Sequence, residues 1–169
     1  MTARNIEQET PNLAANQTDI KGVACLIQAE LPLFQRFEAF YRVFSDAPFQ
    51  DVEEIYSSNV QFEDPIHTLQ GLDALTGYLS GSLKNVRFCR FEFLRRLVGE
   101  GQASYVWRMY FAHEKINGGE ELVVPGSSFL LFDDKITFHQ DFYDMGAMLY
   151  EHIPVLKFGV KAIKRRIGS

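Results

Sequence analysis

A carboxylate at the end of a short alternating stretch is the first candidate for chemistry. Apolar and polar residues alternate from residue 60 onward, and Asp64 follows Val60 and Phe62 at steps of two. Strand side chains repeat every two residues, so we expect the Asp64 carboxylate on the core-facing side. A buried carboxylate is suited to general acid or base work near neutral pH. The structural alternative is that Asp64 and Pro65 only end a strand and begin a turn.

A histidine and an aspartate two residues apart form the second candidate. His139 and Asp141 share one face of a predicted strand with Thr137 and Tyr143. At this spacing the two side chains can hydrogen-bond to each other or to a residue of a neighbouring strand. An aspartate that orients a histidine fixes which ring nitrogen carries the proton. The pair is therefore either an acid and base or an ordinary hydrogen-bonded pair.

Other kinds of catalytic centre lack their sequence signatures. The four histidines show neither HxH nor HxxxH spacing, and the two cysteines, Cys25 and Cys89, are far apart. No phosphate-binding loop, dinucleotide glycine fingerprint or nucleophile elbow occurs. We therefore expect no metal and no cofactor, which leaves cofactor-free proton transfer or water activation. The cysteine usage favours a reducing, cytoplasmic environment.

Composition indicates one aromatic-rich domain. The chain has 169 residues, of which 46% are hydrophobic, including 15 Phe and 7 Tyr. Aromatic residues in this number suit the core of a curved sheet and the walls of an apolar pocket. The net charge of −5 argues against a nucleic-acid partner, because such a protein needs a basic surface. With no apolar run long enough to cross a membrane and no secretion signal, we expect a soluble intracellular protein.

Helical periodicity dominates the first half of the chain. Apolar residues recur at steps of three and four from Leu33 to Phe44 and again from Leu72 to Leu83. A shorter helix is predicted from Phe49 to Tyr56, where acidic residues lie near the helix N-terminus. The strand that carries Asp64 follows directly.

Strand patterning dominates the second half. Long aromatic and β-branched runs predict strands over residues 86–98, 103–114, 121–132 and 135–143. Glycine-rich turns at 99–101 and 117–119 connect them as hairpins, and Pro125-Gly126 predicts a bulge or bend. This order predicts an α+β domain over residues 31–150, in which a curved antiparallel sheet wraps around two to three N-terminal helices as a cone-shaped roll.

The two ends of the chain differ from this domain in composition. Residues 1–30 begin with a polar run of Asn, Gln, Thr and Glu, which predicts a flexible extension. Residues 151–169 combine an apolar stripe at helical spacing with five Lys and Arg residues and no acid after Glu151. They predict a basic amphipathic C-terminal helix. Such a helix either packs on the domain or a sister subunit, or lies on an anionic membrane surface.

One predicted hairpin strand alternates two sets of large side chains. Tyr105, Trp107 and Met109 belong to one set, and Arg108 and Tyr110 belong to the other. One of the sets lines the concave side of the sheet. Its rings could fill a core or form the wall of an apolar ligand pocket.

Several short motifs follow one another in an order known from one fold superfamily. They are Glu54-Ile55-Tyr56-Ser57 leading into Val60 to Pro65, Gln70 to Leu75, Gly126 to Phe129, and Lys135-Ile136 with His139 to Asp144. Together they resemble the nuclear transport factor 2-like superfamily. This is the cone-shaped fold of ketosteroid isomerases, SnoaL-type polyketide cyclases and limonene epoxide hydrolases, and the likeness covers about residues 33 to 145.

This resemblance implies roles for particular residues. Asp64 falls where the isomerases place their proton-shuttling aspartate, directly before a proline. The isomerases also hold the developing oxyanion with a tyrosine and a carboxylic acid. Those two positions align here with Phe40, the neighbour of Tyr41, and with Ser128, so Tyr41 or Tyr110 would have to supply the phenol.

The other two relatives in the superfamily make different demands. The cyclase comparison requires a pocket and an acidic residue on the last strand, which Asp141 satisfies. The epoxide hydrolases carry an Arg-x-Asp that helps to activate water. Its nearest match here is Arg108-Met109-Tyr110 after a one-residue shift, with tyrosine in place of aspartate. The hydrolase function is therefore less favoured than the fold it shares.

Two functions of different classes remain open. The first is a binding protein or cofactor-independent isomerase- or cyclase-like enzyme for a small apolar molecule, with Asp64, Asp141 and His139 as catalytic groups. Its predicted ligand-binding residues are Tyr41, Phe40, Phe62, Trp107, Tyr110 and Ser128. The second is a non-catalytic homodimerisation or adaptor module that pairs through its sheet face. In that case the basic C-terminal helix contacts a partner or a membrane surface.

Overall fold

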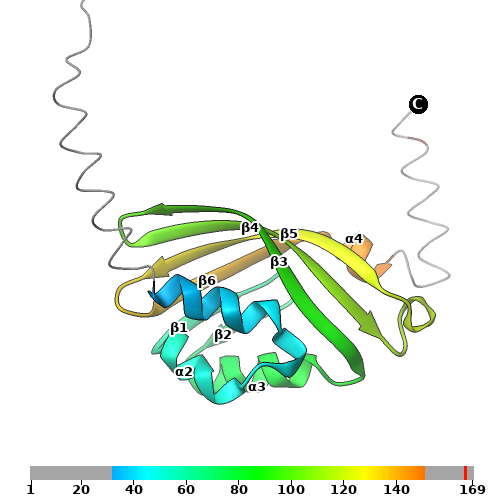
Figure 1. The fold of residues 1–169 in the computed structure, drawn as a ribbon, viewed down its shortest axis with the longest axis horizontal. Helices are drawn as coiled ribbons and strands as arrows, with labels where there is room; N and C mark the ends of the chain where they lie inside the picture. Colours follow the sequence, from blue (N-terminus) through cyan, green and yellow to red (C-terminus); the bar gives the residue numbers. More distant parts are fainter. Residues whose placement is uncertain (1–31, 151–165, 167–169) are drawn as a thin grey trace, which may run out of the picture.

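A six-stranded sheet with helices packed on one side makes up the domain (Figure 1). The structure is a computed structural model that describes residues 32–150 and Arg166. The strand order in the sheet is β2-β1-β6-β5-β4-β3. The first helix and the helices α2 and α3 lie on the same side of the curved sheet, so the α+β cone predicted from the sequence is confirmed.

The helices bury the aromatic and leucine faces that their periodicity indicated. Residues 32–42 are helical, and their buried side chains are Leu33, Phe34, Phe37, Phe40 and Tyr41. Two 3-10 turns, η1 (Phe44–Asp46) and η2 (Phe49–Asp51), lead into α2 (Val52–Ile55). Helix α3 (Leu72–Ser82) buries Leu75 and Leu79 against the sheet. The helix predicted to end at Tyr56 stops one residue earlier, because Tyr56 begins a strand.

The long strands occur where aromatic and β-branched runs predicted them. The strands are β1 (Tyr56–Glu63), β2 (Thr68–Gln70), β3 (Val86–Gly99), β4 (Gln102–His113), β5 (Leu122–Phe132) and β6 (Ile136–Tyr143). Strands β3 to β6 pair antiparallel, as predicted. Strand β1 pairs parallel with β6, which places Phe62 beside His139 and makes the sheet mixed. The three-residue strand β2 was not predicted, since it is too short for an alternating pattern.

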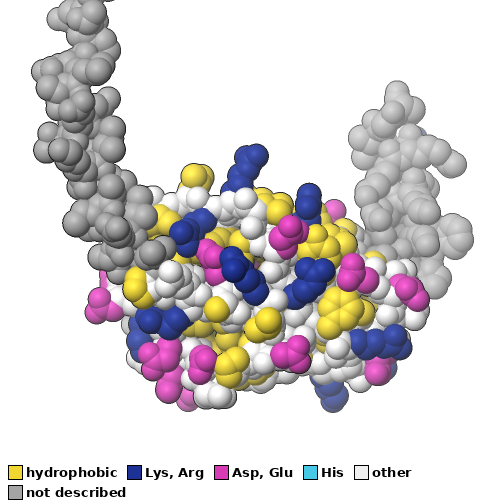
Figure 2. Space-filling view, viewed as in Figure 1, with side chains coloured by type: hydrophobic (Ala, Val, Ile, Leu, Met, Phe, Trp, Pro, Cys, Tyr) yellow, Lys and Arg dark blue, Asp and Glu magenta, His cyan; other side chains and the backbone are white. Residues whose placement is uncertain are grey.

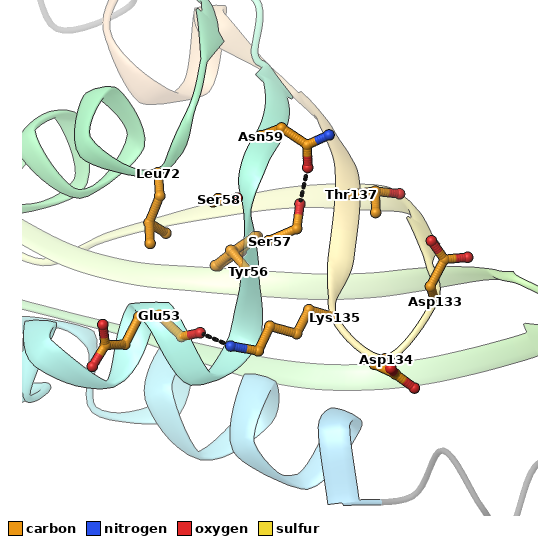
Figure 3. Close-up of a pocket in the computed structure, with 10 residues that line it drawn as sticks. All are labelled: Glu53, Tyr56, Ser57, Ser58, Asn59, Leu72, Asp133, Asp134, Lys135 and Thr137. Carbon is orange, nitrogen blue, oxygen red and sulfur yellow. Dashed lines mark hydrogen bonds between the residues drawn. The ribbon is translucent and has the colours of Figure 1, made fainter.

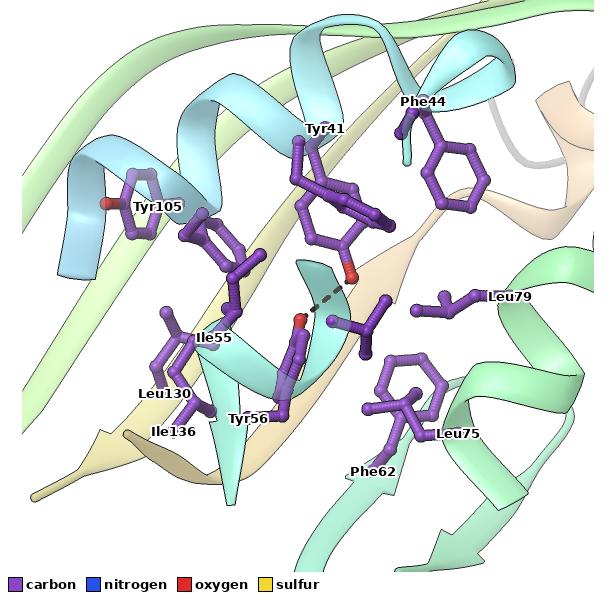
Figure 4. Packing of buried hydrophobic residues seen from close by; sticks show 14 of the residues in the cluster. Tyr41, Phe44, Ile55, Tyr56, Phe62, Leu75, Leu79, Tyr105, Leu130 and Ile136 are labelled. Carbon is purple, nitrogen blue, oxygen red and sulfur yellow. Dashed lines mark hydrogen bonds between the residues drawn. The ribbon is translucent and has the colours of Figure 1, made fainter. Parts of the chain in front are cut away.

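The alternation along β4 and β6 decides which side chains face the helices. Tyr105 and Trp107 are buried on the concave side, whereas Val106 and Arg108 are exposed on the outer side. Ile136 was predicted on the face opposite His139, yet it is fully buried. The β5–β6 pairing shifts register just beside it, between Leu131 and Phe132. Figure 4 shows how residues of the first helix, α3 and the sheet meet in the core.

The bulge predicted at Pro125-Gly126 is wrong. The β4–β5 register continues through both residues without a shift. Gly126 instead makes room for an indole ring, because a Cβ added there would lie 2.2 Å from Cη2 of Trp107. The same ring is held by a hydrogen bond from its Nε1 to Ser128 Oγ, 2.8 Å long.

We expect Gly126→Ala to destabilise the fold by about 1–3 kcal/mol, because the new methyl group overpacks a ring that is fixed in place. Urea denaturation would measure the change. Gly77→Ala is the matched control: Gly77 lies within α3 with nothing within 4 Å of an added Cβ. That control should stabilise the protein by about 0.5–1 kcal/mol. Equal stabilities for the two variants would contradict this role of Gly126.

The ends of the chain carry predictions that the structure does not reach. The flexible extension over residues 1–30 and the basic amphipathic helix over residues 151–169 lie outside the described residues, apart from Arg166. The contact of that helix with a membrane surface stays a prediction. Within residues 32–150 no helix is long and apolar enough to cross a membrane.

Candidate functional site

A chain of hydrogen bonds crosses the core from the first helix to the last strand. Tyr41 Oη lies 2.8 Å from Tyr56 Oη, a contact drawn in Figure 4. Tyr56 Oη lies 2.8 Å from His139 Nδ1, and His139 Nε2 lies 2.8 Å from Asp141 Oδ1. The predicted hydrogen bond between His139 and Asp141 is therefore confirmed. The imidazole is almost completely enclosed, with 1% of His139 exposed.

The chain continues on the other side of Asp141. Ser128 Oγ donates a hydrogen bond to Asp141 Oδ1, and Trp107 Nε1 donates to Ser128 Oγ. The register of the sheet explains this, because Trp107 lies opposite Gly126, and Ser128 lies opposite Asp141. Three neighbouring strands therefore hold one carboxylate by its Oδ1 atom.

The indole fixes the bond directions on one side of Asp141. An indole N–H can only donate, so the Ser128 hydroxyl oxygen accepts from Trp107 and its proton goes to Asp141. On the other side, the directions depend on the tautomer of His139. In the Nε2–H tautomer, His139 donates to Asp141, Nδ1 accepts from Tyr56, and the Tyr56 oxygen accepts from Tyr41. In that tautomer all donors along the chain point toward Asp141.

Burial keeps the phenols of this region protonated. Desolvation, followed by the charge of Asp141, raises the pKa of Tyr41 above its ordinary value. Desolvation and the neighbouring Tyr41 raise the pKa of Tyr56 well above that value. The pKa values of Tyr78 and Tyr143 are also raised, first by burial and then by interaction with Asp64. These hydroxyls are therefore neutral near pH 7 and can donate one hydrogen bond each.

A small aromatic pocket lies at the Asp141 end of the chain. Its volume is about 90 Å³. It is lined by Tyr41, Phe44, Phe62, Tyr78, Leu79, Phe91, Trp107, Met109, Asp141, Tyr143 and Met148. The space exceeds that of one water molecule and is below the roughly 300 Å³ of sites for drug-sized ligands. It therefore fits a ligand, or the end of one, with a few heavy atoms.

Asp64 is buried, and its carboxylate already has hydrogen-bond partners within the protein. Its side chain is 2% exposed, which confirms that it points inward. Oδ1 accepts hydrogen bonds from the backbone N–H groups of Ile66, at 2.7 Å, and His67, at 2.6 Å, and so closes the turn after β1. Oδ2 accepts from the Tyr78 hydroxyl. Asp64 is not among the pocket-lining residues and reaches the pocket through Tyr78.

The other predicted ligand-binding residues divide into two groups. Phe62 and Trp107 line the pocket together with Tyr41. Ser128 is not in the lining and hydrogen-bonds to Asp141, which is. Phe40 packs against Phe44 and Phe49 away from the pocket lining. Tyr110 lies on the outer face of the sheet, where its hydroxyl donates to Glu92 Oε2 at 2.7 Å. The structure therefore brings all of them together except Phe40 and Tyr110.

Eight residues of this region were not predicted as site residues: Phe44, Tyr56, Tyr78, Leu79, Phe91, Met109, Tyr143 and Met148. Tyr143 follows Asp141 by two residues on one strand, so the strand period alone could have found it. Tyr78 lies three residues after Leu75 on the buried side of α3, beside the leucines that defined the predicted stripe. Tyr56 and Phe91 carry no local signal, because they join the site only through strand pairing.

A larger surface hollow lies at the opposite ends of β1 and β6 (Figure 3). It measures about 600 Å³ and is lined mainly by polar side chains, including Asp133 and Asp134. There Lys135 Nζ donates to the backbone oxygen of Glu53 at 2.6 Å. None of the three predicted catalytic residues lines it. In the part of the chain that the structure describes, no three potential metal-ligating side chains cluster.

Solved structures share this fold. A protein with a ketosteroid isomerase-like fold from Catenulispora acidiphila, in complex with trimethylamine, aligns with a TM-score of 0.62 and 12% identity, over 69% of this chain and 91% of that chain. A candidate SnoaL-like polyketide cyclase from a Jannaschia species aligns with a TM-score of 0.64 and 12% identity, over 73% and 90%. A nuclear transport factor 2-like protein of unknown function from Burkholderia pseudomallei gives 0.62 and 12%, over 72% and 97%.

Sequence comparison identifies the family. A comparison with curated protein sequences found no match. The family described as SnoaL-like domain matches residues 37–139, which is more than half of the chain. The solved structures show the fold alone at their level of identity, and they confirm the nuclear transport factor 2-like resemblance. The chain belongs to the SnoaL-like domain family.

Proposed function

We propose that the protein binds a small, largely apolar molecule in the aromatic pocket and moves a proton on it without a cofactor, as isomerase- and cyclase-like enzymes do. Asp141 is the general base. The observation that carries this proposal is the position of its carboxylate: it lines the pocket, and its side chain is 16% exposed. No described residue donates a hydrogen bond to Oδ2, so this oxygen is available to a ligand.

The remaining residues support the base in separate ways. His139 and Ser128 hold Oδ1, which fixes the carboxylate and leaves Oδ2 without a hydrogen-bond partner among the described residues. Trp107 and Phe91 meet at 74° with ring centroids 5.1 Å apart and form part of the apolar wall. The wall excludes water and positions the acidic carbon. A well-placed general base contributes roughly 100- to 10,000-fold to a rate.

Hydrogen–deuterium exchange tests this function directly. Small molecules with an acidic C–H next to a carbonyl or iminium group would be incubated with the full chain in D₂O and followed by NMR. We expect the protein to accelerate exchange for at least one of them relative to buffer and to heat-denatured protein. Absence of any acceleration across the panel would leave the non-catalytic adaptor function as the better account.

We also propose that the outer face of the sheet pairs with a second copy of the chain. The register places Val106, Ser127 and Phe142 in one row across this face. Phe142 is 51% exposed, and Val106 and Leu131 are exposed as well. On the face seen in Figure 2, hydrophobic side chains are interspersed with charged ones of both signs. Exposed apolar patches on a sheet commonly mark an interface.

Phe142→Glu is expected to convert a dimer into a monomer, because the substitution would bury a charge in the interface. Size-exclusion chromatography with light scattering would measure the mass. Ile66→Glu is the matched control, since Ile66 is 53% exposed and lies in the turn after β1. The proposal fails if the unmodified protein is already monomeric, or if both variants dissociate equally.

A further inference from the structure

Most polar groups that line the aromatic pocket already have partners outside it. Tyr41 shares a hydrogen bond with Tyr56, and the indole N–H of Trp107 donates to Ser128. The hydroxyl of Tyr78 donates to Asp64. Asp141 is an acceptor through its carboxylate and lines the pocket. A ligand in the pocket therefore meets a negative charge.

No positive side chain balances that charge at the pocket. None of the lining residues is Lys, Arg or His. His139 lies behind Asp141 and is not among the lining residues. Arg96 pairs with Glu38 at 2.8 Å, and Arg90 lies over the ring of Tyr110 on the outer face, 4.0 Å from its centroid. His67 lies beside Asp64 rather than in the lining.

The walls are built from aromatic rings that meet at steep angles. Phe91 is inclined by 80° to Tyr41, by 90° to Phe44 and by 74° to Trp107, with centroid separations of 5.3, 6.0 and 5.1 Å. Tyr41 and Phe44 stack at 11°, and Phe91 stands across both of them, so rings bound the space from more than one side. The faces of aromatic rings attract alkylated ammonium groups, and cages of this kind are a known way to bind them.

We propose that the pocket recognises a small organic cation, an alkylammonium or iminium group, held between these rings and Oδ2 of Asp141. The volume of about 90 Å³ agrees with a charged head of a few heavy atoms, with the rest of the ligand extending out of the pocket. This inference rests on the proposed function, because it assigns the substrate class of the same site.

The same ligand class suits a proton transfer to Asp141. Removal of a proton from the carbon next to a carbonyl leaves an enolate, whose oxygen requires a hydrogen-bond donor. The indole of Trp107 and the hydroxyl of Tyr78 already donate elsewhere, to Ser128 and to Asp64. Removal of a proton from the carbon next to an iminium leaves a neutral enamine: the C–H electron pair forms the C=C bond, the C=N pair neutralises nitrogen, and the proton goes to Oδ2. No oxyanion has to be stabilised.

Equilibrium binding tests the inference without any turnover. The full chain with ¹³C-methyl-labelled methionines would be titrated with choline and with 3,3-dimethylbutan-1-ol, in which carbon replaces the charged nitrogen. Met109 and Met148 line the pocket and report occupancy. We expect both methyl signals to shift with choline, at a dissociation constant at least tenfold lower than for the alcohol. Equal affinities, or shifts in neither methionine, would overturn the inference.

Variants separate the charge from the shape. Asp141→Asn and Phe91→Leu should each reduce the preference for choline at least threefold. If Asp141→Asn does not fold, Phe91→Leu still tests the aromatic wall with the carboxylate in place. Tyr110→Phe, on the outer face, should leave the preference unchanged. If Asp141 supports proton exchange but choline is not preferred, the proposed function stands and the cation assignment is wrong. A choline preference without exchange activity would support the cation assignment and rule out the proposed proton transfer.

Discussion

Asp141→Asn should slow proton exchange on the best substrate by about 100-fold or more, because the amide cannot accept the proton that the carboxylate accepts. The substitution keeps the size of the side chain and can still accept hydrogen bonds from His139 and Ser128 at its oxygen. The fold should therefore survive. The rate would be measured by NMR in D₂O, with circular dichroism and thermal unfolding as checks of structure.

Asp64→Asn is the matched control for that experiment. Asp64 is buried, but its oxygens serve two backbone N–H groups and Tyr78 rather than the pocket. We expect a loss of stability of about 1–3 kcal/mol, since charged hydrogen bonds inside the protein are weakened, and exchange rates within a few fold of the unmodified protein. The opposite pattern, with activity lost at Asp64 and kept at Asp141, would assign the base to the isomerase-like position.

His139→Leu is expected to lower the free energy of unfolding by about 3–5 kcal/mol, because it removes the centre of a buried polar chain. The change leaves the Tyr56 hydroxyl and Oδ1 of Asp141 each without one enclosed partner. Leucine fills most of the vacated volume, so the loss should come from unpaired polar groups rather than from a cavity. Urea denaturation of the full chain would measure it.

Two milder substitutions place the effect along the chain. Tyr41→Phe removes only the last donor, and about 1 kcal/mol is expected. Tyr56→Phe interrupts the middle and should cost more than Tyr41→Phe, because both Tyr41 and His139 lose a partner. If His139→Leu cost less than 1 kcal/mol, or if the order of the two tyrosine variants were reversed, the connected chain would not describe the energetics of this core.

Sequence periodicity was enough to predict the pair on β6. His139 and Asp141 share a face because the strand repeats every two residues, and the same rule turned Asp64 inward. The rule does not state what fills the space around an inward carboxylate. The turn amides of Ile66 and His67 occupy Asp64, and that depends on the local path of the chain after β1. Asp64 therefore points inward, as the alternation predicted, and also closes the turn that was the structural alternative.

Contacts between distant segments could not be predicted in the same way. Tyr56 reaches His139 only because β1 and β6 pair in parallel. The alternating pattern of each strand is compatible with parallel and with antiparallel pairing. The alternation in β4 separated Trp107 from Tyr110, but the sequence did not say which of them faces the helices. The first helix packs on the Trp107 side of β4, where its Phe37 contacts Tyr105. The sequence also did not show that the Trp107 ring packs against Gly126, so a bulge was predicted there instead.

The most direct test is a crystal structure of the full chain with a slow or unreactive analogue of the best exchange substrate. We predict that the ligand lies among Tyr41, Phe91 and Trp107, with its acidic carbon about 3–3.5 Å from Oδ2 of Asp141, the distance of a reactive pair. A ligand bound beside Lys135 in the polar hollow, or in direct contact with Asp64 while Asp141 remains untouched, would contradict the account.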